Sequence, residues 1–165
     1  MKAKLLGFAI LGMILLGCQQ NVWKEFRSPE GQFSLLMPGI PEKGMDRVNT
    51  PIGALEGHTF SVEQNEVRYR VGYADYPENL NQKPDSTHIL NSIRLGVKGT
   101  LLNERTFSLD QHPGRQLLVE SSDGYVKQIR VLLVDKRLYQ LEMMAKLERA
   151  SANDTQKFFN SFQLQ

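Results

Sequence analysis

The feature that most constrains the fold is a run of alternating apolar and polar residues near the middle of the chain. The apolar positions of this run share one face of an extended strand: Val67, Tyr69, Val71 and Tyr73. The polar residues Glu66, Arg68 and Arg70 fall on the opposite face. A period of two predicts a strand with one buried and one solvated face, as in an antiparallel sheet. Gln64 and Asn65 are predicted to form a hairpin turn before it.

Strand patterns recur along most of the chain after residue 21. The segments predicted to be strands are Val22–Arg27, Phe33–Met37, Leu55–Val62, Val67–Tyr76, Arg115–Glu120, Tyr125–Val134 and Leu138–Ala145. The segment 121–124 ends in Asp-Gly and is predicted to be a hairpin turn. Residues 42–53 are predicted to be a loop, since prolines at 38 and 41 end the preceding strand.

Two segments have a helical pattern. Asp85 or Ser86 can cap a helix whose apolar residues recur every fourth position, at Ile89, Ile93, Val97 and Leu101. Asn153 or Asp154 can cap a shorter helix that carries Phe158, Phe159 and Phe162 on roughly one side. Together these elements predict an α+β fold: a mainly antiparallel sheet of six to eight strands with helices packed on it.

The N-terminus has the pattern of an export signal. Lys2 and Lys4 precede an apolar run from Leu5 to Leu16, which as a helix would span about 18 Å. That length is well short of the roughly 30 Å hydrocarbon core, so the run is typical of a signal peptide. One interpretation is an ordinary cleaved signal peptide whose apolar run happens to end in the chain's one cysteine.

The residues around that cysteine support a more specific interpretation. Leu15, Leu16, Gly17 and Cys18 resemble the lipobox of bacterial lipoproteins. The resemblance implies that residues 1–17 are removed and that Cys18 carries diacylglycerol on its thiol, often with a further acyl chain, such as palmitate, on the new amine. Residues 18–21 would then be a lipidated tether, and residues 22–165 a single α+β domain.

Charge and cysteine content exclude several classes of protein. The chain has 20 Lys and Arg and 18 Asp and Glu, so the loss of Lys2 and Lys4 leaves a balanced domain. Without a basic excess or a basic run, we do not expect nucleic acid as a partner. Because Cys18 is the single cysteine, the domain must be stable without disulfides.

No catalytic signature appears in the sequence. His58, His88 and His112 have no metal-ligand spacing, and no Gly-x-Ser-x-Gly motif is present. His58 shares strand parity with Phe60 and is predicted to be partly buried. We therefore predict no catalytic residue, no metal ligand and no cofactor besides the covalent lipid on Cys18. A metal site assembled from residues distant in sequence stays open.

Four basic residues on the predicted strands are candidates for an interaction surface: Arg68, Arg70, Lys127 and Arg130. Their positions have outward or mixed parity, so they could form a basic face that binds a partner. The alternative is a solvated sheet edge, where charged side chains discourage aggregation.

Several short phrases occur together in one known family. Residues 33–39 (Phe-Ser-Leu-Leu-Met-Pro-Gly), 113–115 (Pro-Gly-Arg) and 159–162 (Phe-Asn-Ser-Phe), with the central capped helix, resemble PsbP/Mog1-type proteins. The resemblance covers about residues 22–164 and implies an α/β/α sandwich. Its PsbP branch further implies a lipid-anchored accessory of photosystem II assembly, on the lumenal or periplasmic side.

These observations lead to one main expectation and two alternatives. We expect a membrane-anchored lipoprotein that acts as a non-catalytic binding or assembly module for a protein partner in a membrane complex. It would lie on the exported side of an outer, plasma or thylakoid membrane. The alternatives are an envelope hydrolase with a site assembled from scattered polar residues and a structural envelope lipoprotein.

Overall fold

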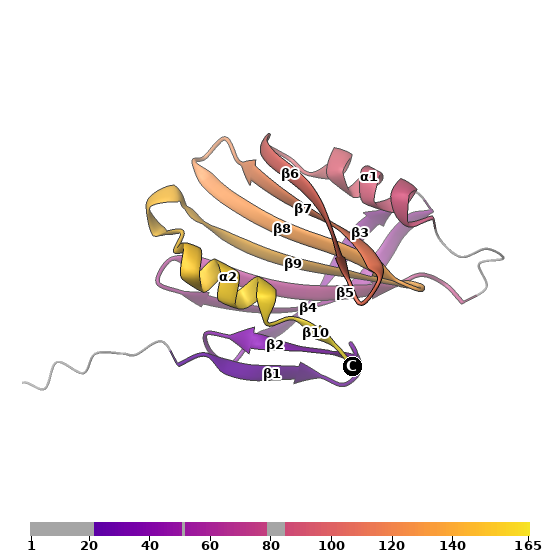
Figure 1. Cartoon of the computed structure of the whole chain (residues 1–165), viewed down its shortest axis with the longest axis horizontal. Coiled ribbons are helices and arrows are strands. Elements are labelled where there is room, and N and C mark those ends of the chain that lie inside the picture. Colours follow the sequence, from indigo (N-terminus) through magenta and orange to yellow (C-terminus); the bar gives the residue numbers. More distant parts are fainter. Residues whose placement is uncertain (1–21, 51, 79–84) are drawn as a thin grey trace, which may run out of the picture.

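The described part of the chain folds into two antiparallel sheets and two α-helices (Figure 1). The computed structural model describes residues 22–50, 52–78 and 85–165. The seven strands of the large sheet lie in the order β3 (Glu42–Thr50), β4 (Gly53–Gln64), β5 (Val67–Asp75), β9 (Arg137–Lys146), β8 (Tyr125–Val134), β7 (His112–Glu120) and β6 (Thr100–Leu109). The small sheet has the order β1 (Lys24–Ser28), β2 (Phe33–Met37) and β10 (Gln163–Leu164). The prediction of an antiparallel sheet of six to eight strands is confirmed by the large sheet.

The helices cover opposite faces of the large sheet (Figure 1). Helix α1 (Ser86–Gly96) lies on one face, and its Ile89 and Leu90 pack into an apolar core there. Helix α2 (Ala152–Asn160) follows the short 3-10 helix η1 (Leu147–Arg149) and lies on the other face beside the small sheet. The two faces of the large sheet are called the α1 face and the α2 face below.

The alternating run in β5 is oriented as its pattern predicts. Its apolar residues, Val67, Tyr69, Val71 and Tyr73, are all buried on the α2 face. They pack there with Phe33 of the small sheet and Phe158 of α2. The hairpin before the run is also present, although Asn65 and Glu66 form the turn, both with positive φ, one position later than predicted.

Two sets of polar contacts join the small sheet to the large one, and that of Tyr139 is buried. Arg137 forms a bidentate ion pair with Asp75 at 2.6 and 2.8 Å, and it also donates to the carbonyl of Glu30 at 2.8 Å. The Tyr139 hydroxyl donates to the carbonyl of Gly31 at 2.8 Å. Both acceptor carbonyls lie in the turn between β1 and β2, so the large sheet holds this turn directly.

Two segments were assigned the wrong secondary structure, and both are edge strands in the structure. Residues 42–53, predicted to be a loop, contain β3, which pairs with β4 over its whole length. The helix predicted to reach Leu101 ends at Gly96, and residues 100–109 form β6. Most residues of β3 and β6 are exposed, because each strand has a neighbour on one side only. An exposed edge strand does not need alternating apolar residues, and its sequence pattern is correspondingly weak.

The caps of the two helices can be compared with the predictions. Asp85 caps α1 as predicted, because its side chain accepts from the backbone of Thr87 at 2.9 Å and of His88 at 3.4 Å. Ser151 caps α2, where its hydroxyl accepts from the backbone of Asp154. The predicted caps of α2, Asn153 and Asp154, lie inside its first turn.

The anchoring segment lies outside the described residues. This applies to the predicted signal peptide (1–17), to the lipobox residues Leu15, Leu16, Gly17 and Cys18, and to the tether (18–21). Among the described helices, none is both long enough and apolar enough to cross a membrane.

Candidate functional site

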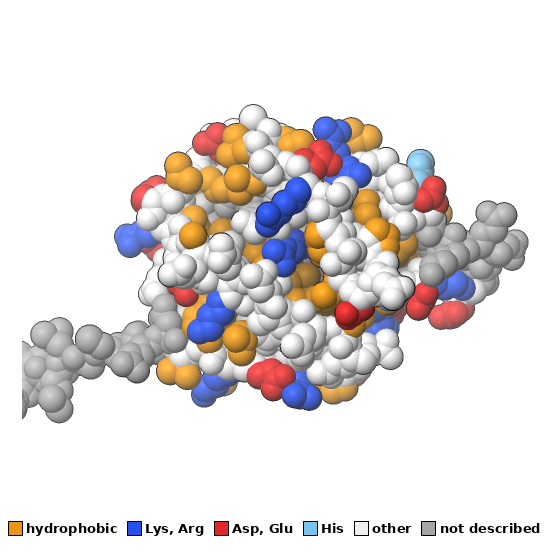
Figure 2. All heavy atoms as spheres, viewed as in Figure 1, with side chains coloured by type: hydrophobic (Ala, Val, Ile, Leu, Met, Phe, Trp, Pro, Cys, Tyr) orange, Lys and Arg blue, Asp and Glu red, His pale blue; other side chains and the backbone are white. Residues whose placement is uncertain are grey.

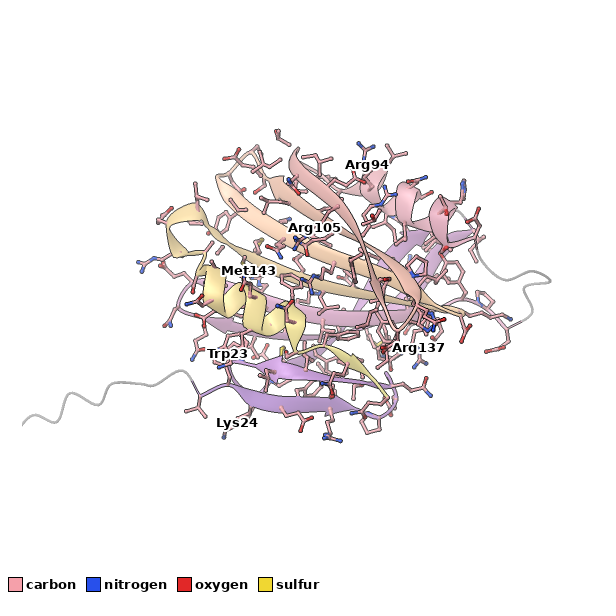
Figure 3. All side chains as sticks on the ribbon, in the orientation of Figure 1. Trp23, Lys24, Arg94, Arg105, Arg137 and Met143 are labelled. Carbon is pink, nitrogen blue, oxygen red and sulfur yellow. The ribbon has the colours of Figure 1, made fainter. Side chains whose placement is uncertain are left out.

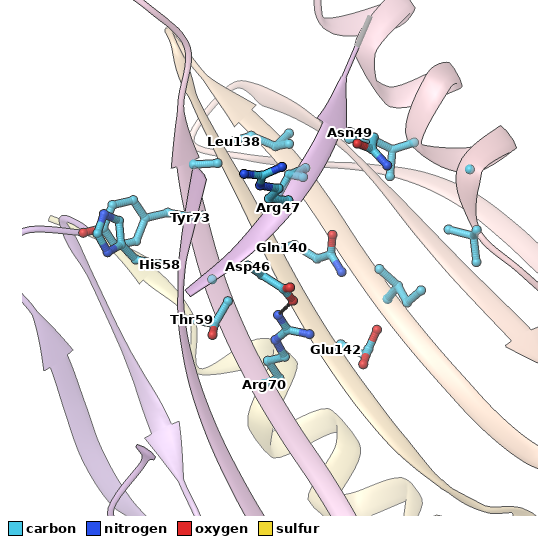
Figure 4. Close-up of a pocket in the computed structure, with 18 of the residues that line it drawn as sticks. Asp46, Arg47, Asn49, His58, Thr59, Arg70, Tyr73, Leu138, Gln140 and Glu142 are labelled. Carbon is cyan, nitrogen blue, oxygen red and sulfur yellow. Dashed lines mark hydrogen bonds and ion pairs between the residues drawn. The ribbon is translucent and has the colours of Figure 1, made fainter. Parts of the chain in front are cut away.

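A groove of about 390 Å³ opens on the α1 face between α1 and β3 (Figure 4). Its floor is formed by the middle strands of the large sheet, through residues such as Arg70 of β5, Gln140 of β9 and Ile129 of β8. Ile93 of α1 and Asp46 of β3 lie on its two walls. Its volume falls within the range of cavities that bind small molecules or single side chains, about 300–1,000 Å³.

The groove exists because the α1 face is only partly covered. Helix α1 has 11 residues and packs over one end of the sheet. Beside it, Gly72 brings no side chain to the floor, and a Cβ there would lie 2.9 Å from the carbonyl oxygen of His58. Since that contact is shorter than normal packing allows, the close pairing of β4 and β5 at this point requires glycine. The absence of a side chain leaves the floor open.

An ion pair lies across the polar side of the groove (Figure 4). Arg70 donates to the carboxylate of Asp46, which reaches it from the edge strand β3. This hydrogen bond and the positive charge of Arg70 hold the pKa of Asp46 below its usual value. Glu142 lies directly opposite Arg70 in the strand register. The groove therefore presents a charged side with carboxylate and guanidinium groups next to each other.

The other side of the groove is apolar. Ile93 and Val97 of the α1 segment, together with Leu138 and Ile129 of the sheet, line this side. A site with one apolar and one charged side can bury part of a ligand while orienting it through a few polar contacts. Such an arrangement suits a side chain or a short segment of another molecule.

Acyl or group transfer needs a nucleophile hydrogen-bonded to a base, and the described residues that line the groove show no such arrangement. Ser92 donates its hydroxyl to the backbone carbonyl of His88 at 2.9 Å. His58 is exposed and stacks on Tyr73, with ring centroids 5.0 Å apart. It lies on the same strand face as Phe60, as predicted, although partial burial was wrong. Among the described residues, no group of three or more His, Cys, Asp or Glu could hold a metal ion.

Comparison with solved structures gives the fold a name. The solution structure of cyanobacterial PsbP (CyanoP) from Synechocystis sp. PCC 6803 aligns with 90% of this chain and 96% of its own, with a TM-score of 0.52 and 14% identity. The chain has a PsbP-like fold. A crystal structure of a Bacteroides thetaiotaomicron VPI-5482 protein aligns with 86% of this chain and 48% of its own, with a TM-score of 0.53 and 9% identity. No protein-family model and no curated protein matches the sequence.

The strand register places the four basic residues that were candidates for one interaction surface on both faces of the large sheet. Arg68 and Lys127 both lie opposite Met144 in the register, which places them on the α1 face together with Arg70. Arg130 lies opposite Leu141 and points to the α2 face. Lys127 and Arg130 are separated by an odd number of positions along one strand, so their side chains must point to opposite faces.

Three of the groove's polar residues were not predicted from the sequence: Asp46, Gln140 and Glu142. Asp46 falls in the segment that was predicted to be a loop. Gln140 and Glu142 alternate with buried residues of β9, and this parity was the one available signal that they share a face. Their proximity to Asp46 depends on the pairing of β3 with β4 and of β5 with β9, which no local pattern specifies.

Proposed function

We propose that this chain is a membrane-anchored lipoprotein whose PsbP-like domain binds a protein partner in a membrane complex, on the exported side of a bacterial membrane. In this proposal the domain is a binding or assembly module that catalyses no reaction. The α/β/α sandwich arrangement of PsbP/Mog1-type proteins fits the placement of α1 and α2 on opposite faces of the large sheet.

The observation that carries the proposal is the groove between α1 and β3. It combines an apolar wall with the Asp46–Arg70 ion pair, and it contains no nucleophile hydrogen-bonded to a base among its described residues. Binding needs only shape and complementary charge, both of which this groove offers. A hydrolase would additionally need an activated nucleophile, so the binding function is the better match.

The anchoring part of the proposal depends on Cys18. The lipobox pattern at residues 15–18 supports lipidation, and residues 19–21 would leave only a short link to the start of β1. Two or more acyl chains anchor a protein stably, at about 0.8 kcal/mol per buried methylene group. The accessory role in photosystem II assembly is the narrower form of this proposal, and the shared fold with CyanoP is what supports it.

Replacing Cys18 by Ser tests the anchor. The wild-type chain should incorporate labelled fatty acid and sediment with membranes, whereas Cys18→Ser should do neither, because serine offers no thiolate for alkylation. Membrane sedimentation of the Cys18→Ser chain, together with no fatty-acid label on the wild type, would contradict the anchoring proposal.

Site-specific cross-linking tests the binding function. A photoreactive amino acid at Gln140, in the groove, should give a reproducible adduct with a protein of a membrane complex. The same amino acid at Ile40, which is 89% exposed and outside the groove, is the matched control and should not give that adduct. Equal labelling from both positions, or no adduct from Gln140, would contradict the proposal. In a photosynthetic source, the narrower role also predicts co-migration with photosystem II intermediates.

A further inference from the structure

Two arginines lie close together on the α2 face, and neither has a carboxylate partner among the described residues. Arg105 of β6 and Arg130 of β8 both donate to the same atom, the side-chain oxygen of Gln116 in β7, at 3.0 and 2.7 Å. Within the described part of the chain, neither arginine forms an ion pair. Figure 3 shows Arg105 near the middle of this face, between the upper strands and α2. Figure 2, in the same orientation, shows blue side chains near the middle of this face.

The position of Arg130 is held by the end of α2. Its guanidinium donates to the backbone carbonyl of Phe159 at 2.9 Å and to the side-chain oxygen of Asn160 at 3.1 Å. The group also lies over the rings of Phe107 and Phe159, at 5.5 and 5.0 Å from their centroids. These contacts fix the guanidinium in one orientation before any ligand binds, which lowers the entropic cost of binding.

The side-chain amides of Gln116 and Asn160 accept from the arginines through their oxygens and keep their NH₂ groups as donors. Gln116 and Asn160 both turn their amide oxygens toward guanidinium groups, so the NH₂ group of each amide is available to donate outward. Arg105 uses one of its nitrogens on Gln116 and is otherwise exposed. Guanidinium and amide NH groups therefore converge on one patch of surface, and among the described residues neither guanidinium of this patch is paired with a carboxylate.

Two like charges at this distance repel each other. Burial and the charge of Arg105 both lower the pKa of the Arg130 guanidinium. A negatively charged group placed between the two arginines would remove this repulsion and accept several charge-assisted hydrogen bonds. Where Arg94 and Arg115 come together on the described surface, the carboxylate of Glu104 fills that role.

We propose that Arg105, Arg130, Gln116 and Asn160 form a binding site for a carboxylate group, presented by an acidic segment of a protein partner. The site lies on the face of the sheet opposite the groove. It depends on the proposed function in one respect, namely that the partner is a protein. Planar guanidinium groups bind carboxylates in a bidentate manner, and the exposed position of Arg105 allows a chain segment to approach.

The probe for this site is a labelled peptide of alternating glutamate and glycine, and its control is the matching peptide of glutamine and glycine. Fluorescence anisotropy with the full chain in detergent should show binding of the glutamate peptide, weakened by added salt, and no binding of the glutamine peptide. Arg105→Gln should weaken binding by about tenfold, the effect of losing one charge-assisted contact.

Arg27→Gln is the matched control variant. It removes the same charge from β1, where Arg27 already pairs with Glu25 at 2.9 Å, and it should leave peptide binding unchanged. Within the described structure Arg105 makes one side-chain hydrogen bond, so Arg105→Gln should keep the thermal stability of the wild type. Arg130→Gln is less suitable as a test because it also removes contacts to the end of α2.

Three results would overturn the inference: no binding of the glutamate peptide, equal binding by the wild type and Arg105→Gln, or binding of inorganic phosphate at Arg105 without binding of the peptide. The last result would assign the site to phosphate groups instead. None of these results affects the cross-linking test at Gln140, because that position lies on the opposite face of the sheet. The failure of this inference and the failure of the proposed function are therefore distinguishable.

Discussion

The hydrogen bond from Tyr139 to Gly31 gives a direct test of how the small sheet is held. In Tyr139→Phe the aromatic ring remains in the core while the hydroxyl is lost. The Tyr139 side chain is 2% exposed, and its hydroxyl is 2.8 Å from the Gly31 carbonyl oxygen. Gly31 is itself buried, so the carbonyl has no water to replace the lost donor.

The expected cost follows from this burial. A buried acceptor left without its partner costs about 1–3 kcal/mol. The ring contacts of Tyr139 with Phe33 and Phe162, at centroid distances of 6.1 and 5.6 Å, should persist in the variant and add no cavity cost. We therefore expect the free energy of unfolding to fall by about 2 kcal/mol, which for a domain of this size lowers Tm by roughly 4–8 °C.

Urea unfolding followed by Trp23 fluorescence measures this change. Trp23 is the one tryptophan of the chain, and it packs edge-on against Tyr69 at 5.3 Å, so its emission should report loss of the core. Tyr125→Phe is the matched control, since the hydroxyl of Tyr125 has no hydrogen-bond partner in the described structure and its loss should change stability by less than about 0.5 kcal/mol. If Tyr139→Phe is as stable as Tyr125→Phe, the argument from the buried carbonyl is wrong.

Two further predictions concern Tyr69 and the glycines of the groove. Burial raises the pKa of Tyr69 to about 12, so the folded chain holds this proton more tightly than the unfolded chain. The corresponding stability is present below about pH 10 and is lost as the pH rises toward 12. An alkaline ultraviolet titration checks this, and a Tyr69 that ionises near pH 10 in the folded state would contradict it. Gly72→Ala should destabilise by about 1–3 kcal/mol because its Cβ would lie 2.9 Å from a backbone oxygen. Gly96→Ala, in α1 with nothing within 4 Å, should instead stabilise by up to about 1 kcal/mol, and thermal unfolding of both variants checks the pair. Equal effects of the two substitutions would refute the packing argument.

Local sequence patterns predicted the inner strands of the large sheet but not its two edge strands. The strands β5, β8 and β9 lie inside the large sheet, and burial imposes alternation or continuous apolar residues on them, which the sequence displays. The edge strands β3 and β6 are mostly exposed, and their strand state depends on pairing with one neighbour. The groove was not predicted from the sequence for the same reason, because one of its walls is β3.

The sequence by itself determined the inward face of β5, the start of α1 at a cap at Asp85 or Ser86, and the need for a core without disulfides. These are consequences of side-chain period, of local hydrogen bonding and of the cysteine count, all of which act over short stretches of chain. Only the tertiary structure decided that Asp46 meets Arg70, that Arg105 and Arg130 share Gln116, and that Arg130 lies opposite the other predicted basic residues. Each of these depends on which strands pair and in what register, and register is set by the burial of the whole sheet and not by any single segment.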